Sequence, residues 1–162
     1  MPAGPEADLN ILLHPIAYVR SPRTGLEDDH WGDVVSRIEL VPEVDPAALD
    51  GIEAFSHVEV IFCFDRIPDH QVERRRRHPR GNRAWPEVGI FAQRAAGRPN
   101  RLGATIVRLE GREGGVLTVR GLDAADGTPV LDLKPVMREF LPREPVRQPE
   151  WAGELMRHYW AG

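Results

Sequence analysis

Short stretches in which apolar and polar residues alternate run along the chain and predict β-strands. In residues 57–64, every second side chain from Val58 to Phe64 falls on one face of an extended backbone. Ile61 and Cys63 make the other face apolar as well, which is typical of a central strand. Six further stretches have strand-like patterns: Ile16–Val19, Val34–Val41, Val88–Gln93, Ala104–Glu110, Val116–Arg120 and Val130–Leu133.

The spacing of these strands predicts the fold class. Turn residues separate them, and 15 glycines and 15 prolines interrupt longer periodic stretches. We therefore expect a mainly β protein, a small β-barrel of about seven strands rather than a βαβ array. One helical turn is predicted over Asp45–Leu49, with Asp45 as N-cap and Pro46 at the first helical position. Without an internal repeat or linker, residues 1–162 are expected to form one domain, with a C-terminal extension over 136–162.

The clearest helix pattern closes the chain. Pro149 and Glu150 suit a first turn, and Trp151, Leu155 and Tyr159 recur at a spacing of four. Met156 and Trp160 widen this apolar stripe. We expect the stripe to pack against the barrel or against a partner subunit, rather than to bind a cofactor.

Charge divides the chain into three parts. The formal net charge is −4, but residues 1–73 carry −11, residues 74–112 carry +9 and residues 113–162 carry −2. A basic segment in an acidic chain is an electrostatic footprint for a polyanion. The chain has a single lysine, Lys134, so a general preference for arginine explains the residue type, although not the clustering.

Several functional classes find no support in the sequence. It has no P-loop, nucleophile elbow, Rossmann fingerprint or His-Glu-x-x-His motif. Its six histidines form no close pair at ligand spacing, so no metal is expected. No apolar run approaches the roughly 18 residues of a membrane span, and no export signal is evident. Cys63 is the only cysteine; we expect it to pack inertly in a protein of the reducing cytoplasm.

The stretch Gly89–Thr105 has unusual chemistry. A strand-like run enters a loop with Arg94, Arg98 and Arg101, in which Gly97 and Pro99-Asn100 favour turns. Such a loop can direct guanidinium groups towards a carboxylate or phosphate. It can equally be a long hairpin loop decorated with arginines.

A second stretch, Gly121–Pro135, contains a strong turn signal. Asp126-Gly127 predicts the turn, and Asp123 and Asp132 flank it. A carboxylate there could accept hydrogen bonds from a ribose or an amine. Alternatively, it could cap its own turn by accepting from backbone N–H groups, and the turn chemistry alone favours this second interpretation.

Together these stretches resemble the tRNA N6-threonylcarbamoyladenosine methyltransferases, a family of small S-adenosylmethionine-dependent β-barrel proteins. The family patterns are Gly-hydrophobic-Phe-Ala-Thr-Arg, Arg-Pro-Asn-Pro-Ile-Gly and Asp-Gly-Thr-Pro-Val-hydrophobic-Asp-Ile-Lys-Pro. Further similarities are to Gly-Leu-x-x-Phe-Ser-His, Arg-Pro-Arg-Gly and an opening Arg-Ser/Thr-Pro. The counterparts keep the family order across about residues 15–136: Arg20–Pro22, Gly51–His57, His78–Gly81, Gly89–Arg94, Arg98–Gly103 and Asp126–Pro135.

The resemblance implies a barrel, a homodimer and a cofactor cleft lined by these loops. S-adenosyl-L-methionine is the implied cofactor, with Arg94 as a candidate partner of its carboxylate. The implied cofactor-binding residues are Asp29, His30, Trp31, Asp65, Arg66, Arg94, Ala104, Asp123, Ala124, Ala125, Asp126, Gly127 and Thr128.

The chain also departs from the family pattern. Gln93 replaces the usual Thr, Arg101 stands where Pro is usual, and Val136 follows Lys-Pro where the family has Tyr. The extended C-terminal domain of some members has no counterpart before the chain ends. Cofactor binding is expected to survive these changes, whereas the methyl acceptor is less firmly implied.

The resemblance implies that the reaction is methylation of threonylcarbamoyladenosine in the tRNA anticodon loop. Asp126 or Asp123 would orient the acceptor nitrogen or accept its proton, and Trp85 could stack on a base. Two alternatives remain: a methyltransferase acting on another RNA or a small metabolite, and a non-catalytic S-adenosylmethionine-binding module. Candidate contacts to tRNA phosphates are Arg74, Arg75, Arg76, Arg77, Arg80, Arg83 and Arg101.

Overall fold

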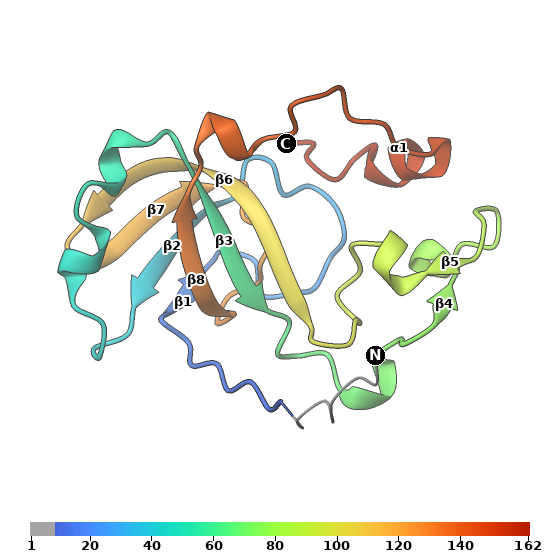
Figure 1. The fold of residues 1–162 in the computed structure, drawn as a ribbon, viewed down its shortest axis with the longest axis horizontal. Coiled ribbons are helices and arrows are strands. Elements are labelled where there is room, and N and C mark those ends of the chain that lie inside the picture. Colours follow the sequence, from blue (N-terminus) through green and yellow to red (C-terminus); the bar gives the residue numbers. More distant parts are fainter. Residues whose placement is uncertain (1–8) are drawn as a thin grey trace, which may run out of the picture.

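Six antiparallel strands close into a barrel in the computed structural model, which describes residues 9–162 (Figure 1). Around the barrel the order is β1-β2-β7-β6-β3-β8. Closure pairs every strand on both sides, so this sheet has no exposed edge. The strands are β1 (Ala17–Arg20), β2 (Val35–Leu40), β3 (His57–Cys63), β6 (Leu102–Glu113), β7 (Val116–Arg120) and β8 (Pro129–Pro135).

Strand β3 is central, as its two apolar faces predict. It pairs with β6 on one side and β8 on the other, and Val58, Val60 and Phe62 are completely buried in the barrel. Gly103 of β6 lies directly against the Phe62 ring, where an added Cβ would come within 2.5 Å of two ring carbons. The glycine is therefore required by packing. Residues from all six strands form the core: Ala17, Val19, Ile38, Val58, Val60, Phe62, Val107, Leu117, Val119 and Val130.

The prediction of a strand over Val88–Gln93 is wrong for most of that stretch. Only Val88–Gly89 is extended, as β5, and it pairs with β4 (Arg76–Arg77) in a separate two-stranded sheet. Residues Ile90–Ala92 form a 3-10 turn, η5. The buried Gln93 side chain explains why the chain turns here instead of continuing as a strand. Its amide donates to the carbonyls of Arg77 and Val88, both at 3.0 Å. The barrel consequently has six strands rather than about seven.

The helical turn predicted at Asp45–Leu49 is confirmed. It is the 3-10 turn η1 (Pro46–Leu49), and the Asp45 carboxylate accepts from the Ala47 N–H at 2.8 Å. The remaining 3-10 turns are η2 (Ile52–Ala54), η3 (Asp69–Gln71), η4 (Pro79–Gly81) and η6 (Arg138–Phe140).

The predicted C-terminal helix is present but short. Helix α1 spans Glu150–Met156, so Tyr159 and Trp160 lie beyond it in a turn and not on its apolar stripe. Across residues 9–162, no helix has both the length and the apolar character needed to cross a bilayer. Cys63 is half-buried at the end of β3, where burial and the nearby Asp65 charge raise the pKa of its thiol. Both effects favour the unreactive thiol form.

The topology gathers three long connections at one end of the barrel. Because the strands alternate in direction, residues 21–34 (β1 to β2), 64–101 (β3 to β6) and 121–128 (β7 to β8) leave from the same end. The short sheet β4–β5 and helix α1 both lie outside the barrel on one side of it (Figure 1). All of the sequence-predicted site residues therefore fall on this end or on its connections.

Candidate functional site

Arg66 joins the three connections at the loop end of the barrel. It lies in the turn that follows β3, and its guanidinium donates to the carbonyl of Thr24 at 2.5 Å and to the carbonyl of Asp126. One side chain thus connects the end of β3, the β1–β2 loop and the acidic turn between β7 and β8. Asp65 lies beside it and is exposed.

The acidic turn is anchored against β1 and the loop that follows it. The Asp126 N–H donates to the Arg23 carbonyl at 2.8 Å, and one Asp126 carboxylate oxygen accepts from the Ser21 N–H at 3.0 Å. Gly127 has φ +83°, a left-handed conformation that glycine adopts without steric cost. Ala124, Ala125 and Thr128 are buried beneath the turn. Asp126 therefore caps the start of the β1–β2 connection rather than its own turn, and it retains one carboxylate oxygen for another partner.

The predicted loop Asp29–Trp31 is organised around a buried indole. Trp31 is 3 % exposed, and its indole N–H donates to the Glu27 carbonyl at 3.1 Å. The Arg23 guanidinium lies 3.8 Å from the centre of the Trp31 ring, a cation–π arrangement, and also donates to the carbonyls of Asp29 and His30. His30 has φ +66°, which is uncommon for a residue with a side chain. One arginine thus both bonds the backbone of this loop and covers its aromatic ring.

Asp123 stands at the centre of a second set of contacts. Its two carboxylate oxygens accept from different donors: the Thr105 hydroxyl, at 2.5 Å, and the Tyr159 hydroxyl. Burial raises the pKa of Tyr159 well above its ordinary value, and the nearby charge of Asp123, the second largest cause, raises it further. The phenol therefore stays protonated and remains a hydrogen-bond donor. Arg94 lies nearby, is exposed, and donates to the Ala104 carbonyl at 2.5 Å.

The predicted phosphate-binding arginines divide into two groups. Arg80 forms an ion pair with Asp29 at 2.9 Å, and Arg101 forms one with Asp69 at 3.0 Å. These two arginines hold loops together and are partly neutralised by their partners.

The other arginines lie, together with Arg80, on an excursion from the barrel. We call residues 74–83 the arginine segment. Arg74 and Arg75 are exposed, and their backbone N–H groups donate to the Glu73 carboxylate at 2.8 and 2.6 Å. These two hydrogen bonds lower the pKa of Glu73, and the bond from the Arg75 N–H has the larger effect. Arg76 pairs loosely with Glu87, Arg77 is half-buried and Arg83 is exposed.

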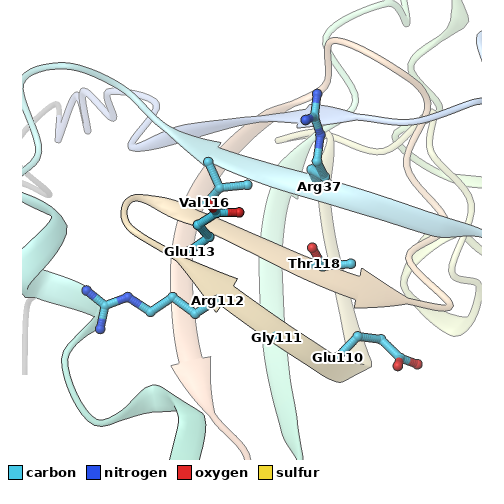
Figure 2. Close-up of a pocket in the computed structure, with 7 residues that line it drawn as sticks. All are labelled: Arg37, Glu110, Gly111, Arg112, Glu113, Val116 and Thr118. Carbon is cyan, nitrogen blue, oxygen red and sulfur yellow. The ribbon is translucent and has the colours of Figure 1, made fainter.

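Shallow hollows lie on the described surface, one of them beside the acidic turn and another on the wall of the barrel. The first is lined by Arg20, Ser21, Pro22, Val35, Arg37 and Asp126, and so borders the candidate site. The second lies on the outer wall of β2, β7 and β6, beside the register shift between Leu109 and Gly111 (Figure 2). None of the sequence-predicted site residues lines this second hollow. Only the first hollow bears on the candidate site.

Three residues of the site were not predicted from the sequence. Thr105 directly follows the predicted Ala104, so its position beside the motif was an available signal. Arg23 and Tyr159 carry no such signal, because their contacts to Trp31 and Asp123 depend on how the loops fold. Residues 9–162 contain no group of three or more histidine, cysteine or acidic side chains placed to hold a metal ion.

The fold and the site together define a class: a small closed β-barrel whose candidate functional residues lie on the connections at one end. The model of the tRNA-methyltransferase O N-terminal domain matches residues 20–140, and the chain belongs to this family. The match leaves the C-terminal residues 141–162 outside the family domain.

Individual relatives differ in how much of their length the chain matches. A "Putative S-adenosylmethionine-dependent methyltransferase RcsF" of Pseudomonas aeruginosa is 46 % identical over 101 residues, 60 % of this chain and 42 % of that protein. A "Probable S-adenosyl-L-methionine-binding protein" of Methanothermobacter thermautotrophicus is 39 % identical over 140 residues, 83 % of this chain and 96 % of that protein. A mouse "tRNA (adenine(37)-N6)-methyltransferase" is 33 % identical over 139 residues, 81 % of this chain and 32 % of the mouse protein.

The fold is also similar to that of a solved structure. The crystal structure of TrmO from Pseudomonas aeruginosa superposes with a TM-score of 0.70 at 32 % identity, covering 88 % of this chain and 62 % of that one. The chain thus spans less than two thirds of this TrmO chain and of two of the three relatives.

Proposed function

We propose that this protein is an S-adenosylmethionine-dependent methyltransferase that acts on tRNA. The observation that carries the proposal is the convergence at Arg66: one guanidinium holds together three connections that each contain a family motif or a predicted cofactor residue. The names of the relatives, which include S-adenosylmethionine-binding proteins and tRNA methyltransferases, support the same activity.

The donor and acceptor groups at the site fit this cofactor. Asp123 accepts one hydrogen bond on each oxygen, and an ionised carboxylate has about four lone-pair sites, so it can accept further bonds from ribose hydroxyls. Arg94 uses one amino group on Ala104 and has further N–H donors for a carboxylate. When bound, S-adenosylmethionine supplies an electrophilic methyl group. The chain binds and orients both reactants, which accounts for much of the acceleration in such a transfer.

The two candidate catalytic aspartates have different surroundings, which favour different roles. Asp126 borders the open hollow beside Arg20 and Arg37, where a nucleotide could approach, whereas Asp123 is half-buried beneath Tyr159. We therefore assign to Asp126 the orientation of the acceptor nitrogen and the acceptance of its proton. We assign to Asp123 the binding of the cofactor.

We propose adenosine 37 of the anticodon loop, carrying the threonylcarbamoyl group, as the acceptor. The mouse relative is named for N6-methylation of adenine 37, and the threonylcarbamoyl group follows from the motif resemblance. The exposed Arg74 and Arg75 would bind tRNA phosphates through a salt-dependent interaction. We also propose a cytoplasmic location, which a tRNA substrate supports.

We further propose that the protein is a homodimer. Leu102 and Ile106 on the outer face of β6 are 39 % and 46 % exposed, and Phe91 in the connection that leads to β6 is 75 % exposed. Exposed apolar side chains on one strand and on the connection that precedes it suit contact with a second copy of the chain. Analytical ultracentrifugation tests this: a monomer at micromolar concentration would contradict it.

Isothermal titration calorimetry with S-adenosylmethionine tests the cofactor. We expect saturable binding to the wild-type protein and weaker binding to Arg66→Ala, because the loss of that guanidinium releases Thr24 and Asp126. The matched control is Arg112→Ala: Arg112 bonds the carbonyls of Gly114 and Pro46 at the opposite end of the barrel, and its removal should leave the affinity unchanged. A wild-type protein that shows no binding would refute the proposal.

A further inference from the structure

The C-terminal segment, residues 149–162, returns to the loop end of the barrel. It begins with α1 and lies beyond the residues that the family model matches. The linker before it and the first residues of the segment, residues 141–150, are all exposed. The segment itself is half-buried at Trp151, Leu155 and Tyr159. Its position is therefore set by its own contacts rather than by the linker.

Backbone bonds attach this segment to the predicted cofactor loop. The N–H groups of His30 and Trp31 donate to the carbonyls of His158 and Tyr159 at 3.0 and 2.8 Å. Gly32 continues the contact, because a Cβ there would lie 2.0 Å from the Trp160 carbonyl oxygen. A glycine is thus required wherever this docking occurs.

A second attachment connects α1 to the loop that follows the arginine segment. The Trp85 indole N–H donates to the Glu154 carboxylate at 2.6 Å. With α1 held there and residues 158–160 held on the cofactor loop, the Tyr159 side chain is directed at Asp123. Tyr159 and Thr105 then occupy one lone pair on each carboxylate oxygen.

We infer that Tyr159 is a positioning residue for the cofactor site, which orients the Asp123 carboxylate so that its remaining lone pairs face the cofactor ribose. This inference rests on the proposed function of Asp123. Tyr159 acts through Asp123 and touches no reacting atom. The C-terminal segment is consequently part of the site, although the family domain ends before it.

The first test compares Tyr159→Phe with a matched removal of a hydroxyl, Tyr18→Phe. The Tyr18 hydroxyl makes no hydrogen bond within residues 9–162, so its loss should leave S-adenosylmethionine affinity unchanged. Tyr159→Phe should weaken that affinity about tenfold, in keeping with one hydrogen bond to a charged group. Circular dichroism and the melting temperature establish whether each variant is folded.

A second comparison separates positioning from a general structural role. In an Asp123→Ala background, Tyr159→Phe should cost no further affinity, because the group that Tyr159 positions is already absent. A tenfold loss in both backgrounds would overturn the inference and leave the proposed function intact. Equal affinities for Tyr159→Phe and wild type would also overturn it. Wild-type protein without affinity would instead refute the proposed function.

Gly32→Ala offers an independent way to displace the segment. The added Cβ meets the Trp160 carbonyl, so the affinity should fall at least as far as in Tyr159→Phe. Gly111→Ala is the control, since a Cβ there meets nothing within 4 Å. Wild-type affinity in a folded Gly32→Ala protein would contradict the inference.

Discussion

The loops at the end of the barrel and the arginine segment are built in opposite ways. In the loops, the polar groups already have partners: Arg66 bonds two carbonyls, and Arg23 bonds two carbonyls and covers Trp31. In the arginine segment, Arg74, Arg75 and Arg83 are exposed, and it is the backbone N–H groups of Arg74 and Arg75 that donate to the Glu73 carboxylate.

This difference indicates which region suits which partner. A small ligand needs groups held in place before it arrives, because ordering them afterwards costs affinity. A polyanion such as RNA needs accessible positive charge and tolerates mobile side chains. The two regions are joined where Arg80 of the arginine segment pairs with Asp29 of the β1–β2 connection.

The largest effect is expected from Asp126→Asn. The amide oxygen can still accept from the Ser21 N–H, so the loop should fold, while the group assigned to accept the proton is lost. The turnover rate should fall about 10²–10⁴-fold, the range typical of general base catalysis. Methyl-transfer kinetics measure this, with calorimetry to show that cofactor affinity is retained. Full turnover would show that Asp126 is only a cap.

The next effect concerns the barrel that supports the loops. Gly103→Ala should lower the free energy of unfolding by about 1–3 kcal/mol, because its Cβ overpacks the Phe62 ring. Gly111→Ala on the same strand has open space and should change stability much less. Urea denaturation of both variants measures the difference. Equal stabilities would show that β6 can shift and that the loop end is not rigidly supported.

A smaller effect is expected from the arginine segment. The double variant Arg74→Gln/Arg75→Gln should bind tRNA about tenfold more weakly and reduce the slope of log affinity against log salt by about 1.4, or 0.7 for each lost phosphate contact. Cofactor affinity should be unchanged. Arg143→Gln/Arg147→Gln removes the same charge from exposed positions in the C-terminal linker and is the control. If both pairs weaken tRNA binding equally, the effect is one of net charge alone.

The smallest effect is a pH dependence of stability. Burial raises the pKa of Tyr159 in the folded protein, whereas an unfolded tyrosine ionises near pH 10. The stability that Tyr159 contributes is therefore fully present below about pH 10 and is lost as the pH rises further. Wild type should lose more stability than Tyr159→Phe between about pH 9 and pH 11 in urea denaturation. Equal losses would contradict the buried, protonated phenol.

The barrel could be predicted largely from the sequence because alternation reports which face of a strand is buried. Val116–Arg120 is predicted to the residue, and the two apolar faces of β3 correctly mark it as central. Val88–Gln93 has a similar pattern, but its apolar Ile90 is buried in a turn instead. The buried Gln93 amide bonds two carbonyls there, and no local pattern reports such a contact.

The site was predictable where the chemistry is local to a motif. The acidic turn lies where Asp126-Gly127 places it, whereas Arg66 lies in a turn beyond β3, which ends at Cys63. The contact between Tyr159 and Asp123 joins residues 36 positions apart. Helical spacing placed Tyr159 on an apolar stripe, but α1 ends at Met156, so the side chain turns towards the barrel end instead. The cofactor and substrate roles of these residues stay predictions.

The most direct test of the proposed function is transfer of a labelled methyl group from S-adenosylmethionine to tRNA. Two tRNA preparations, identical except for the threonylcarbamoyl group on adenosine 37, would be incubated with the full chain. We predict labelling of the tRNA that carries the group, and none of the tRNA that lacks it. No labelling of either tRNA by folded, cofactor-binding protein would contradict tRNA methylation, and equal labelling of both would contradict the proposed acceptor.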